Sequence, residues 1–442
     1  MFHRFGPFCL GLALVTALTL SASKAGAMTK VEEVVSAGGI KAYLISEPSI
    51  PFMSLSFRFA GGAIGDPEGR EGVANLVSVL LDEGAGDLDS QAFQTELEDL
   101  AIQLSFSTGR DSFAGDLKTL TENRDRAFEL LRLALNKPRF DDAPIARMKS
   151  QVQAGLRRRL DDPDRLASRT WFERAFGDHV YARPVDGTID TVESITTEDL
   201  RTFVKTRFAK DNLLIGVAGD ITGEELGPLL DQTFGELPNT ATPLPANPTT
   251  PRDTGISVVR QDVPQSKVLF GQKGLMRGDP DYYAAYVTNH ILGGGGFSSR
   301  LTKEIREARG LAYSVYSYLY PAEQAPIWMG GLGTSNATVS EALGLVQSEI
   351  RRMAEGDVSE QELADAKTYL TGSFPLRLTS NDRIAALLVS MQVHNLGPDY
   401  LANRNGFIEA VTLEDLRRVA ARLYDPDGLL TVVVGDPPDL EG

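Results

Sequence analysis

The residues with the clearest chemical potential lie close together in the second half of the chain. Arg306 and, seven residues later, Tyr313 follow a run of four consecutive glycines, which are Gly293, Gly294, Gly295 and Gly296. A guanidinium and a phenol both donate hydrogen bonds to a carbonyl oxygen or an oxyanion, and glycine lets a ligand approach the backbone closely. Each residue also has an ordinary interpretation: the arginine as a helix-surface cation beside glutamates, the tyrosine as a strand residue, and the glycines as a turn that enters a helix.

The residues needed for other catalytic chemistry are missing from the sequence. The chain has no G-x-S-x-G nucleophile motif and no G-x-x-x-x-G-K phosphate loop, and its only cysteine is Cys9, near the N-terminus. His179, His290 and His394 are far apart, and none has a second histidine or a glutamate four residues later. We therefore interpret them as surface or hydrogen-bonded side chains and expect no metal site in this chain.

One segment of the first half resembles the zinc-binding segment of the pitrilysin/insulinase-type metallopeptidases. In active members of that family a glycine-rich turn leads into G-x-A-H-x-x-E-H, which carries two zinc ligands and the glutamate that activates water. Here Gly72-Val73-Ala74 matches the lead-in, but Asn75, Ser78 and Val79 stand at the histidine, glutamate and histidine positions. These three positions share one face of a helix, so the resemblance implies a zinc site that has been lost.

The third zinc ligand of the family is also missing. The resemblance places that glutamate near Ala154 or Gly155, shortly before the turn Asp161-Asp162-Pro163. The resemblance therefore implies that this chain binds no zinc. Any zinc ion of the complex is carried by a partner subunit.

The segment from Leu292 to Tyr320 resembles the C-terminal half of the same family. There an arginine and a tyrosine with the spacing of Arg306 and Tyr313 reach back to the active site, and the resemblance implies that these two support the oxyanion at a partner's zinc. The four glycines are similar to the glycine-rich loop with which the non-catalytic subunit of mitochondrial processing peptidase handles substrate. We interpret Arg300 as an anchor of that loop, and Tyr316, Tyr318 and Tyr320 as core or cleft wall.

An internal repeat shows which elements must position these residues. Residues 195–220 align without a gap on residues 411–436, so that Glu198-Asp199-Leu200-Arg201 falls on Glu414-Asp415-Leu416-Arg417 and Gly219-Asp220 on Gly435-Asp436. Each copy predicts a helix capped by Thr197 or Thr412, followed by a buried strand. The chain is therefore a duplicated domain.

The pattern around the repeat predicts an α+β fold of two homologous lobes. Leu55, Phe57 and Phe59 alternate with polar residues, which is typical of a half-buried strand, and residues 358–370 predict a capped helix. The Pro-rich stretch 237–252 predicts a linker between an N-terminal lobe, 28–236, and a C-terminal lobe, 253–442. We expect each lobe to contain a mainly antiparallel sheet covered by helices, and the two to face each other like the halves of a clam.

The N-terminus and the charge indicate where the protein works. Residues 1–27 have a basic start, an apolar stretch and Ala25-Gly26-Ala27, as in a cleavable signal peptide. The apolar stretch is short for a membrane span, so we expect a periplasmic protein without a stable membrane anchor. The net charge of −16 argues against nucleic acid and anionic membranes as partners.

The sequence thus predicts a non-catalytic, peptide-binding subunit of a zinc metallopeptidase, paired with a homologue that bears H-x-x-E-H. The alternative is a proteolytically inactive structural or binding protein of the same fold. An independent hydrolase with an unrecognised site is the third and weakest hypothesis, because the zinc ligands are missing.

Overall fold

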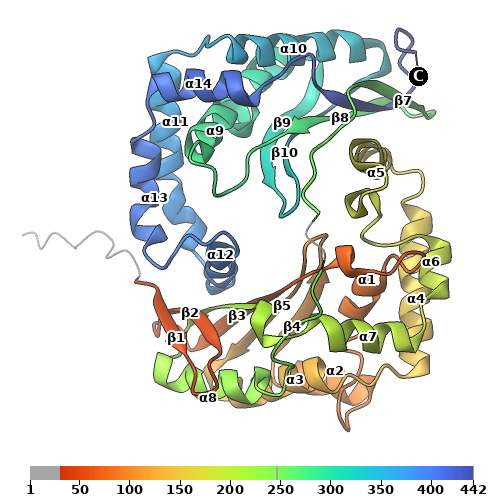
Figure 1. The fold of residues 1–442 in the computed structure, drawn as a ribbon, viewed down its shortest axis with the longest axis vertical. Coiled ribbons are helices and arrows are strands. Elements are labelled where there is room, and N and C mark those ends of the chain that lie inside the picture. The colour runs from red at the N-terminus through yellow and green to blue at the C-terminus, as the bar shows by residue number, and fades with distance from the viewer. Residues whose placement is uncertain (1–29, 245–246, 442) are drawn as a thin grey trace, which may run out of the picture.

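The computed structural model describes residues 30–244 and 247–441, so the predicted signal peptide lies outside the described residues. Two β-sheets occupy opposite halves of the molecule (Figure 1). The N-terminal sheet has the order β1-β2-β6-β3-β5-β4. Its strands are β1 (Glu32–Val35), β2 (Lys41–Ser46), β3 (Phe52–Ala60), β4 (Gln103–Thr108), β5 (Ser112–Leu120) and β6 (Leu213–Gly219).

The C-terminal sheet repeats this plan with one strand fewer. Its order is β7-β11-β8-β10-β9, and its strands are β7 (Gly255–Arg260), β8 (Gln265–Lys273), β9 (Ala312–Pro321), β10 (Pro326–Ser335) and β11 (Leu430–Gly435). The repeat strands β6 and β11 have equivalent places, each parallel to one neighbour and antiparallel to the other, and the remaining pairs are antiparallel. The predicted fold class, two lobes each with a mainly antiparallel sheet and helices, is confirmed.

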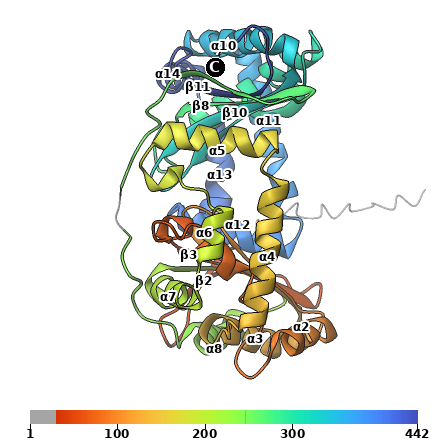
Figure 2. The same ribbon diagram turned by 90° about the vertical axis from the view of Figure 1, so that its right-hand side faces the viewer.

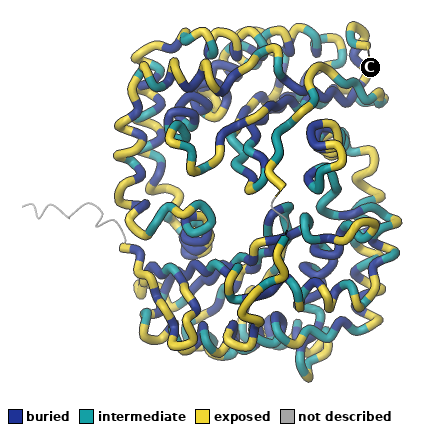
Figure 3. Tube along the Cα trace, in the orientation of Figure 1, coloured by how far each residue is buried: buried dark blue, intermediate teal, exposed yellow. Residues whose placement is uncertain are grey.

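Helices cover the outer faces of both sheets, and Figure 3 shows the sheets largely buried beneath helices with exposed outer turns. The first half contributes α1 (Val73–Ser78), α2 (Ser90–Asp99), α3 (Arg124–Asn136), α4 (Asp142–Arg158), α5 (Pro163–Phe176), α6 (Ile189–Ser194), α7 (Thr197–Arg207) and α8 (Gly223–Phe234). The second contributes α9 (Tyr282–Asn289), α10 (Val339–Ala354), α11 (Glu360–Gly372), α12 (Asn381–Val393), α13 (Tyr400–Glu409) and α14 (Leu413–Leu423). No helix in these described ranges is long and apolar enough to cross a membrane.

The helix of each repeat copy begins with a capping box. Thr412 caps α14 as predicted, with Asp415 as its partner. In the first copy the prediction of Thr197 is wrong: Thr196 caps α7, paired with Asp199. In a capping box, an acidic side chain three residues after the threonine accepts a hydrogen bond from the threonine N–H. Thr196 and Asp199 have that spacing.

Each sheet is also packed by one helix from the other half of the chain. Helix α5 lies against β8 and β11, where Trp171 is fully buried and its indole N–H donates to the Leu430 carbonyl at 3.1 Å. Helix α12 lies against β3 and β6, and the Gln392 side chain donates to the Ile215 carbonyl at 2.7 Å. Figure 2 shows α5 directly below the C-terminal sheet. The two halves are therefore interlocked by a reciprocal exchange of helices.

This exchange corrects the prediction for β3. Its alternation predicted one buried and one exposed face, and Leu55 and Phe57 do lie in the core. Ser54 and Ser56 are buried as well, because α12 covers the second face and Asp382 at its start accepts a hydrogen bond from the Ser54 hydroxyl. Between α8 and β7, the described residues of the predicted linker form neither helix nor strand.

The tip of the β9–β10 hairpin closes the contact between the halves. The Asp111 carboxylate accepts from the backbone N–H of Glu323 at 3.2 Å and from the Tyr181 hydroxyl at 2.6 Å. Arg58 forms an ion pair with Glu323. The C-terminal sheet is thus fastened to the first half of the chain at the tip of this hairpin.

Candidate functional site

Arg306 and Tyr313 lie together and form one exposed group with Phe297. The Arg306 guanidinium carbon is 5.0 Å from the centroid of the Tyr313 ring and 4.6 Å from that of Phe297. Tyr313 is 80% exposed and Phe297 64% exposed. We call these three residues the Arg306 cluster. Folding gains little from two large rings left in water, so the cluster has the character of a contact surface.

The backbone that carries the cluster is irregular at both ends. Arg306 lies in a π-helical segment, Thr302–Glu307, and a second such segment, His290–Gly294, precedes Phe297. In β9, Ser314 pairs with Gly333 but Ala312 pairs with Thr334, so Tyr313 is the extra residue of a β-bulge. π-Helical turns and bulges both occur preferentially at functional sites, where they redirect a side chain.

The glycine run begins as tightly packed backbone. A Cβ at Gly293 would collide with the Ser317 hydroxyl, and one at Gly294 would lie 2.8 Å from the Asn289 amide nitrogen. Both distances are shorter than a side chain tolerates, so only glycine fits these two positions without a shift of the neighbouring groups.

Gly295 and Gly296 complete the turn. A Cβ at Gly295 would lie 2.7 Å from the His290 carbonyl oxygen, and the Gly295 carbonyl accepts from the Ser298 hydroxyl at 2.8 Å. Gly296 has φ +56°, which glycine adopts most easily. Close packing and one left-handed residue therefore account for the four glycines as a turn that enters a helix. That these glycines handle substrate stays a prediction.

Arg300 fastens this turn to helix α11, as its interpretation as an anchor required. Its guanidinium donates twice to Glu362, at 2.7 and 2.8 Å, and once to the Asp357 carbonyl. Burial alone would raise the pKa of Glu362, but hydrogen bonds from Arg300 and Ser359 outweigh it and lower that pKa to about 2. The turn before Arg306 is thus held by a part-buried ion pair.

The degenerate zinc-motif positions lie at α1, against the N-terminal sheet. The Ser78 hydroxyl donates to the Asn75 carbonyl at 2.7 Å, and Val79 packs against the N-terminal core. An amide, a hydroxyl already bonded to its own helix and a valine are not a zinc donor set, so these residues do not fit the metal. Within the described residues, no group of three or more His, Cys, Asp or Glu is arranged to hold a metal ion.

A buried carboxylate sits at the start of the same helix. Asp66 accepts from the backbone N–H groups of Gly72, at 2.8 Å, and Ala74, at 3.0 Å, and so closes the N-terminus of α1. Burial raises the pKa of Asp66 to about 7, although these two hydrogen bonds oppose the shift. Ala154 and Gly155, at the predicted place of the third ligand, lie on α4, which packs beside α1.

The three histidines lie in separate environments. Nε2 of His179 is 2.8 Å from the Asn247 carbonyl, and its Nδ1 accepts from the Tyr181 N–H, so the proton is on Nε2. His290 is buried and stacks on Tyr369. His394 lies at the C-terminal end of α12, between the halves. The interpretation as surface or hydrogen-bonded side chains agrees with the contacts of His179. For His290 it is wrong, because this ring is buried and packs on Tyr369.

Three cavities adjoin one another, and the first two are lined by residues of both halves. The first, about 340 Å³, is lined by Tyr316, Tyr318 and Tyr320 and by Arg110, so the predicted cleft wall is found. The second, about 360 Å³, shares Tyr320 and Arg110 with the first and includes His394. Because neighbouring cavities share lining residues, the three form one row.

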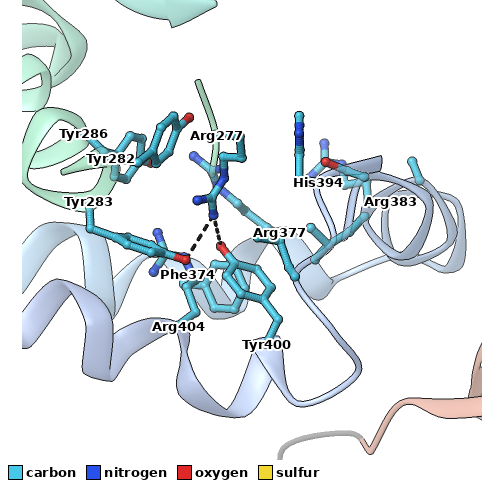
Figure 4. Close-up of a pocket in the computed structure, with 14 residues that line it drawn as sticks. Arg277, Tyr282, Tyr283, Tyr286, Phe374, Arg377, Arg383, His394, Tyr400 and Arg404 are labelled. Carbon is cyan, nitrogen blue, oxygen red and sulfur yellow. Dashed lines mark hydrogen bonds between the residues drawn. The ribbon is translucent and has the colours of Figure 1, made fainter. Parts of the chain in front are cut away.

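The third cavity shares His394 with the second and has a volume of about 480 Å³. Figure 4 shows that arginine and tyrosine side chains from α9, α12 and α13 converge on it. This pocket was not predicted, because its residues come from segments far apart in the chain, and each alone resembles a surface arginine or a helix tyrosine. The pair Tyr282-Tyr283, with Tyr286 one turn later, was the only local signal.

Comparisons with known proteins agree with the fold and the lost site. Residues 41–188 match the family model "Insulinase (Peptidase family M16)", and residues 194–370 match "Peptidase M16 inactive domain". The chain is 31% identical to the non-peptidase homologue YmxG of Helicobacter pylori, over 76% of this chain and 77% of that protein. It is 24% identical to an uncharacterised zinc protease of Streptomyces coelicolor, over 95% of both chains.

A solved structure has the same architecture. The crystal structure of a peptidase M16 inactive domain from Pseudomonas fluorescens superposes with a TM-score of 0.86 at 30% identity, covering 92% of this chain and 97% of that one. Together with the two lobes and the non-ligating residues at positions 75, 78 and 79, these matches place the chain in the insulinase family of peptidases, family M16, as a non-catalytic member.

Proposed function

We propose that this chain is the substrate-binding subunit of a two-chain zinc peptidase. Its partner is a homologue of similar size that carries H-x-x-E-H and the zinc ion, and both chains are exported to the periplasm. The single observation that carries the proposal is the Arg306 cluster, with an arginine held between two exposed rings.

The cluster suits a peptide backbone in an extended conformation. In the described part of the chain, neither the Arg306 guanidinium nor the Tyr313 hydroxyl has a hydrogen-bond partner, so their donors are available to a ligand. The two rings fix the guanidinium through cation–π contacts that leave those donors unused. A donor held in place before the substrate arrives stabilises a carbonyl oxygen that gains negative charge as the partner's zinc-bound water attacks.

A second function is favoured by one relative. The Helicobacter pylori homologue is described as a non-peptidase, which supports a binding or structural protein that never joins a peptidase. The two functions differ in one measurable respect, because only a subunit of a peptidase changes the rate at which a partner cleaves peptides.

The test is reconstitution with an H-x-x-E-H homologue of similar length. Peptide cleavage and bound zinc are measured for each chain alone and for the mixture, and we expect cleavage in the mixture and zinc on the homologue. Replacing one hydrogen-bond donor to the oxyanion costs about 10²–10³ in rate in other hydrolases, so Tyr313→Phe is expected to lower kcat/KM at least about tenfold.

The matched control is Tyr369→Phe, which removes the hydroxyl of an exposed tyrosine that stacks on His290 outside the Arg306 cluster. Cleavage by this chain alone with stoichiometric zinc would overturn the proposal. Equal rates for the homologue alone and for its mixture with the native chain would support the binding or structural function instead, and equal rates for the mixtures with the native chain and with Tyr313→Phe would exclude Tyr313 as an oxyanion donor.

A further inference from the structure

The third cavity, which is lined only by residues of the second half, has a lining that differs in charge from the rest of the protein. Four arginines line it: Arg277 after β8, Arg377 after α11, Arg383 on α12 and Arg404 on α13. None of the residues that line it in the described chain is acidic. We call it the arginine–tyrosine pocket. In a protein of net charge −16, such a concentration of unmatched positive charge points to an anionic ligand.

The four arginines lack the ion pairs that other arginines of this protein make. Among the ion pairs within residues 30–244 and 247–441, none involves any of the four. Asp279 is only two residues from Arg277, yet it pairs with Arg422 at 2.7 Å. The pocket is therefore left with positive charge that neighbouring carboxylates do not neutralise.

The positive charge of the pocket also affects His394, which lies at its side. Burial is the main cause that lowers the pKa of His394, and the positive charges of Arg277 and Arg58 lower it further, to about 4. A bound anion would relieve that repulsion.

Arg277 is held in place before any ligand arrives. Its Nη2 donates to the hydroxyls of Tyr283, at 3.0 Å, and Tyr400, at 3.2 Å, as Figure 4 shows. Its guanidinium carbon also lies 4.2 Å from the centroid of the Tyr282 ring. A guanidinium fixed in this way presents a planar set of donors that matches a carboxylate, and ordering it in advance lowers the entropy cost of binding.

The walls of the pocket also fit the rest of an organic ligand. Phe374, Leu387 and Leu396 add apolar surface beside the tyrosine rings, and the volume of about 480 Å³ is typical of pockets for ligands larger than a simple ion. The pocket adjoins the second cavity along α12, where the two share Ala386, Ser390 and His394. A chain that lies along the row of cavities between the halves can therefore place one end in it.

We propose that the arginine–tyrosine pocket binds a carboxylate of a peptide, either its C-terminus or an acidic side chain. This inference rests on the proposed function and deepens it, since it gives the bound peptide a preferred charge and a direction between the halves. Binding to the pocket needs only this chain, so it can be measured without the partner.

The experiment is calorimetric titration of the full chain with a defined eight-residue peptide of alanine, leucine and phenylalanine that contains two glutamates and a free C-terminus. Three analogues replace the glutamates by glutamine, the C-terminal carboxylate by an amide, or both. A hydrogen-bonded charge is worth roughly tenfold or more in affinity, so the doubly neutral analogue is expected to bind at least about tenfold more weakly. The two single analogues show which carboxylate the pocket takes.

Variants of the protein locate the binding. Arg277→Gln is expected to reduce affinity for the acidic peptide about tenfold. The double variant Arg377→Gln/Arg383→Gln repeats the test with two arginines that are exposed. Arg351→Gln removes the same charge at a distant, exposed ion pair with Asp427 and is expected to leave affinity unchanged.

Three results would overturn the inference: equal affinity for the acidic and neutral peptides, equal losses for Arg351→Gln and the pocket variants, or displacement of the peptide by inorganic phosphate at the peptide's own concentration. The last would indicate an unselective anion site. Failure of the proposed function would be seen separately. If the chain binds the acidic peptide through Arg277 but never raises a partner's cleavage rate, the inference holds and the subunit role is wrong.

Discussion

Tyr313 is exposed because one extra residue in β9 changes the direction of its side chain. On either side of it the strand pairs regularly with β10, and the buried residues Ala312 and Val315 flank the bulge. The bulge disrupts the ladder hydrogen bonds locally, and it leaves the Tyr313 ring exposed to water. The physical consequence is a phenol hydroxyl and a guanidinium that share one exposed surface.

At the residue scale we predict that His394 makes stability depend on pH. Its pKa in the folded protein is lowered to about 4, against about 6.5 in an unfolded chain. Between these values the unfolded chain binds more protons than the folded one, so stability falls as pH drops from about 6.5 to 4. We expect His394→Gln to remove this contribution, so that urea unfolding midpoints of the variant decline less over that range.

His179→Gln provides the control, since His179 lies near Asn247, away from Arg277. The prediction is wrong if the midpoints of the native protein and the His394→Gln variant keep a constant difference from about pH 4 to 6.5.

The candidate site residues could be named from the sequence, but their environments could not. The family resemblance identified positions 75, 78 and 79 as the places of the zinc ligands, and Asn75, Ser78 and Val79 are not such ligands. The same resemblance paired Arg306 with Tyr313, and the two side chains lie together in the structure. The bulge at Tyr313 and the pocket around Arg277 depend on partners that are distant in the chain. A local pattern holds no information about such partners.

At the scale of elements, α12 and the N-terminal sheet are in unusually close contact at one strand. A Cβ at Gly216, on β6, would collide with the Ala385 carbonyl and lie 2.8 Å from the Leu388 Cβ. Glycine at this position therefore allows a helix of the second half to approach the first sheet. The same helix carries Asp382, which accepts from the Ser54 hydroxyl and pairs with Lys118.

We predict that Gly216→Ala destabilises the protein by about 1–3 kcal/mol, as overpacking of a closed contact does. Gly344→Ala is the matched control, because a Cβ there on α10 meets nothing within 4 Å; it is expected to stabilise by roughly 0.5–1 kcal/mol through helix propensity. Chemical denaturation of both variants measures the difference. Similar effects of the two substitutions would show that α12 does not pack on β6 in solution.

The sequence predicted the helix and strand of each repeat copy, strand β3 and helix α11, but not which sheet each helix covers. The serines of β3 were expected on an exposed face because polar residues in alternation usually face water. Their burial follows from α12, about 330 residues later in the chain. Likewise the apolar residues of α5 are consistent with a buried face without indicating that the sheet of the second half is its partner.

At the scale of the whole molecule, the exchange of α5 and α12 makes the two halves depend on each other. Separating them would expose Trp171, Phe172 and Phe176 on one side and Leu388 on the other. We therefore predict one cooperative transition in calorimetry, with equal van't Hoff and calorimetric enthalpies. Two resolved transitions would contradict this prediction, and Arg351→Gln, at a peripheral ion pair, should leave the single transition in place.

The same interlocking limits how early the fold can be completed as the chain emerges from its N-terminus. The apolar face of α5 is synthesised at residues 163–176, but the β11 strand that receives it spans Leu430–Gly435, nearly the end of the chain. Strand β11 also fills the place between β7 and β8. The first half must therefore wait, with Trp171 unprotected, until the last strand emerges, and its dependence on chaperones should be greatest during that interval.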